Sequence, residues 1–125
     1  MLCPNCSEVE LETRTVEGIG VDRCTSCSGI WLDMLELERL LANRPRELLR
    51  EDRAAAERAE PTESGGQRPC PKCRGGQLIK LNSRHRPGTI VDSCTVCHGT
   101  WLDAGELSRL LGGGLTGWVR DLFGG

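Results

Sequence analysis

Four Cys-x-x-Cys pairs are the residues of this sequence best suited to chemistry. The first two pairs are separated by 17 residues and the last two by 20, so the same unit of paired cysteines occurs twice. Each Cys-x-x-Cys turn places two thiolates on one side of the chain, and two such turns complete the four-thiolate tetrahedron that structural Zn²⁺ prefers. The spacing therefore predicts two zinc ions, one held by Cys3, Cys6, Cys24 and Cys27 and the other by Cys70, Cys73, Cys94 and Cys97.

Paired cysteines have three other common roles in proteins. Disulfides are disfavoured because the sequence has no membrane-span or signal-peptide pattern, and we expect a cytoplasmic protein, in which thiols stay reduced. Haem attachment would suit Cys94-Thr-Val-Cys97-His98, but Ser28 replaces the histidine in the first unit. A rubredoxin-like iron centre uses the same four thiolates, and the spacing alone leaves iron open.

The length and composition agree with a fold that depends on metal. The chain has 125 residues, with three Trp, one Phe and no Tyr. A chain of this size with so few aromatic residues buries a small core, so coordinate bonds are expected to supply much of the stability. We expect strong chelation to unfold each unit.

The two units are alike beyond their cysteines. When Cys24 is aligned with Cys94, the identical residues are Thr25/Thr95, Gly29/Gly99, Trp31/Trp101, Leu32/Leu102, Asp33/Asp103, Glu36/Glu106, Leu37/Leu107, Arg39/Arg109 and Leu40-Leu41/Leu110-Leu111. This is an internal duplication. It divides the chain into a first repeat (1–43), a charged helical and flexible linker (44–67), a second repeat (68–112) and a Gly-flanked peptide (113–125).

Each repeat is predicted to form a β-hairpin followed by a short helix. Val9, Leu11 and Thr13 alternate with glutamates, and the second copy has a turn at 86–88 between two apolar runs. After the last cysteines, aspartates stand at helix N-caps with glutamates three residues on, which is a capping-box pattern; these are Asp33 with Glu36 and Asp103 with Glu106. The predicted fold class is a small metal-stapled α+β protein made of two zinc ribbons.

Three further expectations concern packing. Gly29 and Gly99 suit the positive φ that cysteine turns often need. Trp31 and Trp101 are each expected to pack between the hairpin and the helix of their own repeat. Residues 46–60 are predicted to be helical and 61–67 flexible, which would let the two repeats move independently.

The motifs resemble those of a known family. The segments Cys-Pro-x-Cys, Val-Asp-x-Cys-x-x-Cys-x-Gly-x-Trp-Leu-Asp and Glu-Leu-x-Arg-Leu-Leu resemble the small bacterial zinc-ribbon family named for its likeness to the zinc finger of transcription factor IIB. The resemblance covers both repeats and implies a zinc ribbon at each cysteine quartet. It does not imply basal transcription activity, because the family name records a likeness of fold.

Residues for catalysis are scarce. The sequence has two histidines, no hydrolase triad, no P-loop and no dinucleotide fingerprint, and its cysteine quartets leave no open metal position. We therefore expect a protein that is not an enzyme and has no small-molecule substrate.

The charge is divided unevenly between the repeats. Residues 1–42 carry three Lys/Arg against eight acids, a formal −5, and residues 68–111 carry seven against three, a formal +4. A nucleic acid is a candidate partner of the basic repeat, through Lys72, Arg74, Lys80, Arg84 and Arg86.

The C-terminal peptide suggests a protein partner. One face of a short amphipathic helix would carry Leu115, Trp118, Val119, Leu122 and Phe123. Such a helix needs a surface, either its own ribbons or a groove on a partner. The sequence thus favours an adaptor that binds protein partners, within a transcription or nucleic-acid assembly. The alternative is a zinc-handling or thiol-redox protein resembling the zinc modules of J-domain co-chaperones.

Overall fold

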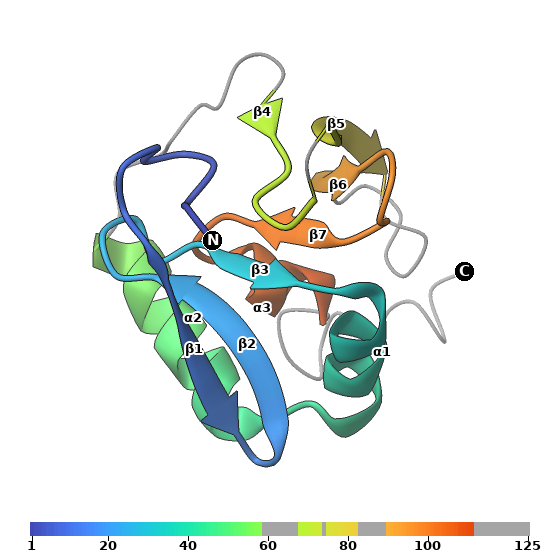
Figure 1. The fold of residues 1–125 in the computed structure, drawn as a ribbon. Coiled ribbons are helices and arrows are strands. Elements are labelled where there is room, and N and C mark those ends of the chain that lie inside the picture. The colour runs from blue at the N-terminus through green and yellow to red at the C-terminus, as the bar shows by residue number, and fades with distance from the viewer. Residues whose placement is uncertain (59–67, 74, 83–89, 112–125) are drawn as a thin grey trace.

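A computed structural model describes residues 1–58, 68–73, 75–82 and 90–111. Their strands form one antiparallel sheet in the order β1-β2-β3-β7-β6-β5-β4, accompanied by three helices (Figure 1). The strands are β1 (Leu11–Val16), β2 (Ile19–Cys24), β3 (Ile30–Leu32), β4 (Arg68–Pro69), β5 (Gln77–Asn82), β6 (Ile90–Cys94) and β7 (Thr100–Leu102). The helices are α1 (Met34–Asn43), α2 (Arg46–Arg58) and α3 (Glu106–Leu110). The α+β fold class is confirmed.

The predicted hairpins are present in the same register in both repeats. In the first, β1 pairs with β2 from Leu11↔Cys24 to Val16↔Ile19, and in the second, Leu78 of β5 pairs with Cys94 of β6. The first turn has positive φ at Glu17 (49°) and Gly18 (80°), as expected of a two-residue hairpin loop. The turn predicted at 86–88 lies outside the described residues.

The two repeats are joined through β3 and β7, so the expectation that they move independently is wrong. These strands pair antiparallel, with Trp31 opposite Trp101 at the centre. All three residues of each strand are buried. A short buried strand leaves unpaired N–H and C=O groups along its free edge, and each repeat satisfies the edge of the other.

Gly29 and Gly99, which stand at equivalent positions of the two repeats, leave space for the indoles at this junction, and this corrects two expectations. A Cβ on Gly29 would lie 2.1 Å from Cζ2 of Trp101, and a Cβ on Gly99 would lie 2.3 Å from Cζ2 of Trp31. Each indole therefore packs against the other repeat, in the space left by a missing side chain. The positive φ expected at these glycines occurs one residue earlier, at Ser28 (63°) and His98 (61°).

The two repeat helices begin differently. Asp33 caps α1 as predicted: its carboxylate accepts from the Glu36 amide at 2.8 Å, and Glu36 accepts from the Asp33 amide at 2.9 Å. The matching prediction for Asp103 and Glu106 is confirmed only for the glutamate, whose carboxylate accepts from the Asp103 amide at 2.8 Å. Asp103 is not the N-cap, because α3 starts at Glu106 with Gly105 as its N-cap. The carboxylate of Asp103 is instead engaged by the indole N–H of Trp101 at 3.1 Å.

The linker helix α2 supplies the missing cap. Asp52, only 1% exposed, accepts hydrogen bonds from the backbone amides of Gly105 and Ser108, each at 3.0 Å, and from the Ser108 hydroxyl at 2.8 Å. A carboxylate there satisfies amides at the start of α3 and favours the positive end of its dipole. Leu48 and Ala55 are buried on the same face of α2. Residues 46–58 are therefore helical, as predicted, and are an integral part of the core.

Two apolar clusters complete the interior. One surrounds the helices and includes Ile30, Leu40, Leu48 and Leu107. The other contains both indoles together with cysteines of both quartets. In the described part of the chain, no helix is long and apolar enough to cross a membrane.

Replacing Gly29 with Ala should destabilise the protein by about 3 kcal/mol, because the new methyl group overlaps the indole of Trp101. The matched control is Gly20→Ala, whose Cβ would lie 3.4 Å from a Glu36 carboxylate oxygen and which should stay within about 1 kcal/mol of the parent. Denaturant unfolding of the zinc-loaded chains measures both. Equal stability of the two variants would contradict the contact between the repeats.

Replacing Asp52 with Ala should cost about 3 kcal/mol, since two buried amides and a hydroxyl lose their acceptor. Glu47→Ala removes an exposed acid from the same helix and should cost less than about 1 kcal/mol. Thermal unfolding followed by circular dichroism compares them. If Asp52→Ala melted like Glu47→Ala, Asp52 would not be the cap of α3.

Candidate metal centres

The structure gathers the eight cysteines into the two predicted quartets. Within each quartet the sulfurs lie within 4.8 Å of one another. Two pairs in the first quartet are 3.7 Å apart, Cys3 with Cys27 and Cys6 with Cys24; in the second, Cys70 and Cys97 are 3.8 Å apart and Cys73 and Cys94 3.4 Å. A tetrahedron with Zn–S bonds of about 2.3 Å has sulfur–sulfur edges of about 3.8 Å. Each quartet thus fits one zinc ion.

The cysteine turns direct backbone amides at the sulfurs. The amides of Ser26 and Cys27 each donate to the Cys24 sulfur at 3.4 Å, and those of Val96 and Cys97 donate to the Cys94 sulfur at 3.3 and 3.4 Å. Cys70 accepts in the same way from two amides, and Cys3 from the amide of Cys6. These donors stabilise thiolates and orient them toward a shared metal.

The thiol pKa values reflect burial and these amides. Burial raises the pKa of Cys70 to about 12, against the opposing effect of two amides. Burial also acts to raise the pKa of Cys94, but the amides of Cys97 and Val96, together with hydrogen bonds from the thiols of Cys73 and Cys70, lower that pKa to about 6. A hydrogen bond with Cys3, followed by burial, raises the pKa of Cys27. Metal uptake must displace protons from the raised thiols, so metal affinity increases with pH.

The second quartet requires a glycine at position 76, which the spacing of the cysteines does not predict. A Cβ at Gly76 would lie 2.5 Å from the Cys94 sulfur and 2.6 Å from the Cys73 sulfur. The chain therefore passes against the cluster with no room for a side chain. The signal in the sequence is Gly75-Gly76, one residue after the third cysteine pair, but a loop glycine pair has many other causes.

The two metal centres lie side by side. Cys3 and Cys70 border the same hollow, of about 360 Å³, together with Leu2, Pro4, Ser7, Pro69 and Pro71. Cross-repeat contacts hold the cysteine turns in place: Asn5 donates to Asp103 at 2.7 Å, and at the equivalent position Lys72 lies 4.0 Å from Asp33. The zinc turns of one repeat thus contact the strand–helix junction of the other.

The residues predicted to contact nucleic acid are only partly described. Lys80 is paired with Asp92 at 3.3 Å, and Lys72 is the partner of Asp33. Arg74, Arg84 and Arg86 lie outside the described residues, as do the predicted docking residues Leu115, Trp118, Val119, Leu122 and Phe123. Both described lysines of the predicted surface therefore face carboxylates of the protein itself.

A group of three acids lies near the second repeat's junction. Asp92, Asp103 and Glu106 place carboxylate oxygens within 4.8 Å of one another. Burial, followed by a side-chain hydrogen bond with Asp103 and repulsion from the two aspartates, raises the pKa of Glu106 to about 8, so this carboxyl favours the folded state less as pH rises from 4.5 to 8. Burial also raises the pKa of Glu36, its equivalent in the first repeat. Asp92 is neutralised by Arg68 at 2.7 Å and by Lys80, so the group is a structural ion network.

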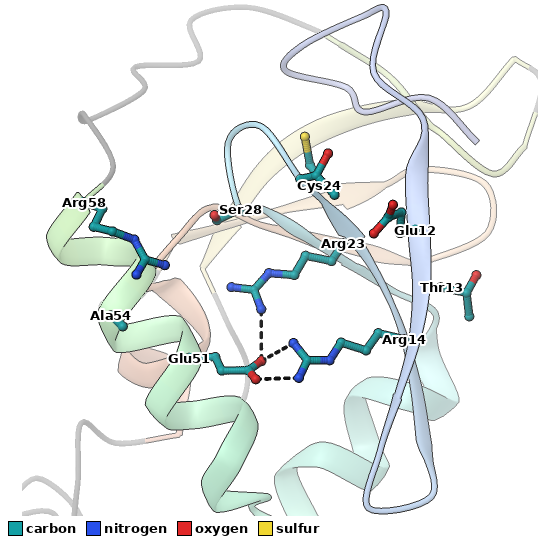
Figure 2. Close-up of a pocket in the computed structure, with 10 residues that line it drawn as sticks. Glu12, Thr13, Arg14, Arg23, Cys24, Ser28, Glu51, Ala54 and Arg58 are labelled. Atoms are coloured by element: carbon teal, nitrogen blue, oxygen red, sulfur yellow. Dashed lines mark hydrogen bonds and ion pairs between the residues drawn. The ribbon is translucent and has the colours of Figure 1, made fainter.

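A hollow of about 560 Å³ lies between the first hairpin and α2 (Figure 2). Glu51 of α2 reaches across it and accepts hydrogen bonds from Arg14 at 2.5 Å and Arg23 at 3.1 Å (Figure 2). The other lining residues are Glu12, Thr13, Cys24, Thr25, Ser28, Ala54 and Arg58. The ion pairs attach α2 to the first repeat. The sequence did not predict the roles of Glu51 and Asp52. The available signal for Asp52 was its position between the apolar residues Leu48 and Ala55 on one face of the helix.

Comparison with known proteins agrees with this geometry. The family model described as the transcription factor zinc-finger matches residues 2–43 and 69–112, one copy for each cysteine quartet. The chain belongs to this zinc-ribbon family. No curated protein and no solved structure matches the chain. The two zinc ribbons match the repeats that the sequence predicted, and α2 lies between the matched segments.

Removing one metal centre should weaken the whole protein. Cys73→Ser with Cys97→Ser should reduce the zinc content from two ions to one and lower the melting temperature of the first zinc ribbon as well, because β3 and β7 share one ladder. Zinc content is measured by plasma mass spectrometry, and unfolding by circular dichroism. Complete chelation should abolish the cooperative transition.

The equivalent variant of the first ribbon, Cys6→Ser with Cys27→Ser, provides the comparison. It should lower the melting temperature of the second ribbon in the same way. Two separate transitions, with the intact ribbon melting at its original temperature, would show that the ribbons fold independently. Retained secondary structure after verified metal removal would show that zinc is not required for the fold.

Proposed function

We propose that this protein is a non-enzymatic adaptor, in which two zinc ribbons hold a rigid surface that binds protein partners, within a transcription or nucleic-acid assembly. The observation that carries the proposal is the closed donor set: four sulfurs surround each metal position at tetrahedral spacing. A metal with four protein ligands has no position for water or substrate, which is the arrangement of structural zinc.

The union of the ribbons supports the same function. Zinc centres in small proteins generally stabilise a surface, and here the two centres stabilise one continuous sheet. The C-terminal residues Leu115, Trp118, Val119, Leu122 and Phe123 are the proposed partner-docking segment, with Trp118 and Phe123 as anchors. Apolar side chains are also exposed on α1, where Met34 and Leu35 are 52% and 61% exposed.

A second candidate function is zinc handling or thiol redox chemistry. It is favoured by the unequal burial of each cysteine pair: the first cysteine is buried, and the second is partly accessible. Reversible oxidation would start at an accessible sulfur and release the metal.

Partner capture tests the adaptor function. The tagged protein is purified at native expression level with nuclease treatment, beside a variant carrying Trp118→Ala and Phe123→Ala. We expect a stoichiometric protein partner that survives nuclease and is lost from the variant. Arg120→Ala with Asp121→Ala, which lies off the apolar stripe, is the matched control and should retain the partner. A partner retained equally by both variants would contradict docking through this segment.

Zinc release separates the two functions. An adaptor should keep both ions in the presence of mild peroxide, while a redox or zinc-handling protein should lose zinc reversibly as thiols oxidise. A colorimetric zinc indicator and thiol counting follow the two events together. Reversible release coupled to thiol oxidation would overturn the adaptor function.

A further inference from the structure

The linker helix α2 lies between the two segments that the family model matches. Most of its acidic side chains lie on a different side of the helix from three of its arginines. Its acids are mostly used by the protein itself. Asp52 caps α3, Glu51 binds Arg14 and Arg23, and Glu47 lies 3.7 Å from Arg14. The arginines on the opposite side of the helix take no part in these contacts.

Three of these arginines form a stripe along the exposed face. Arg46, Arg50 and Arg53 are spaced four and three residues apart, so they follow one side of the helix over about 10 Å. All three are exposed, and no carboxylate in the described part of the chain lies within ion-pair distance of them. They border a hollow of about 460 Å³ together with Leu49, Ala54 and Glu57.

We propose that this arginine stripe, Arg46, Arg50 and Arg53 of α2, binds the phosphate backbone of a nucleic acid. Guanidinium groups bind phosphate oxygens through paired hydrogen bonds. Contacts to the phosphate backbone of a nucleic acid need positive charge and do not need apolar side chains at the centre of the interface. A length of about 10 Å corresponds to about three nucleotides of one strand. The helix is held rigidly by Asp52 and Glu51, so the three charges are presented in fixed order.

Other anionic partners fit the stripe less well. A protein interface needs buried apolar or aromatic anchors at its centre, and the stripe has only half-buried Leu49 and Ala54 beside it. A membrane-surface helix inserts its apolar face, but the apolar face of α2, with Leu48 and Ala55, is buried in the core. The proposed surface also differs from the second ribbon, where Lys72 and Lys80 face carboxylates.

This inference goes beyond the proposed protein partner and is tested without it. Fluorescence anisotropy with the purified zinc-loaded chain measures binding to a labelled 20-nucleotide single strand and to its duplex. We expect binding at 50 mM salt. Raising the salt concentration from 50 to 200 mM should weaken the affinity for the duplex about 40-fold, as three phosphate contacts require. Arg46→Gln with Arg50→Gln and Arg53→Gln should weaken binding at 50 mM salt at least about tenfold. The slope of log affinity against log salt concentration should then correspond to about three fewer phosphate contacts.

The matched control removes three exposed positive charges away from the stripe, by Arg39→Gln, Arg58→Gln and Arg109→Gln, and should bind nearly as the parent does. Zinc content and circular dichroism confirm that both triple variants are folded. Glu57→Gln removes the one acid bordering the hollow and should strengthen binding severalfold. Absence of binding, equal loss in both triple variants, or weaker binding by Glu57→Gln would overturn the proposal. Preferential binding of polyglutamate or anionic vesicles would also overturn it.

Discussion

Each indole of the central strand pair occupies space that exists because the other repeat has no side chain there. Trp101 fills the position of a Cβ on Gly29, and Trp31 fills that of a Cβ on Gly99. This reciprocal contact lets β3 and β7 approach, pair and continue one sheet through both repeats. The metal centres are then side by side, and their cysteines pack in one cluster with the indoles. Zinc coordination and strand pairing therefore stabilise the same region of the molecule.

Duplication has not produced two identical halves. In the first repeat Asp33 caps its own helix, while in the second the equivalent Asp103 accepts hydrogen bonds from Trp101 and Asn5. The helix that follows Asp103 starts later and takes its cap from Asp52 of the linker. The linker helix α2 is thus necessary for the second repeat, because the buried amides at the start of α3 require a hydrogen-bond acceptor and their own repeat does not supply it.

The linker also changes how the surface charge should be interpreted. By sequence, α2 mixes arginine and glutamate, and its net charge is small. In the fold Glu51 faces the hairpin and Asp52 faces α3, so that three exposed arginines share the outer face of the helix with a single acid, Glu57. A charge count over residues cannot distinguish a balanced surface from one whose acids are turned inward, and the two differ greatly in the field they present to a charged partner.

The sequence by itself determined the local features of this protein. The cysteine quartets, the two hairpins, the capping box at Asp33 and the duplication all depend on residues close in the chain or on fixed metal-ligand chemistry. The tertiary structure alone decided the β3–β7 junction, the purpose of Gly29 and Gly99, and the use of Asp52 as a distant cap. These contacts join residues 53 to 72 positions apart. Which groups meet depends on how the two repeats pack against each other. Neither a space in the packing nor an amide without an acceptor leaves a periodic signal in the sequence, so these contacts could not be predicted from it.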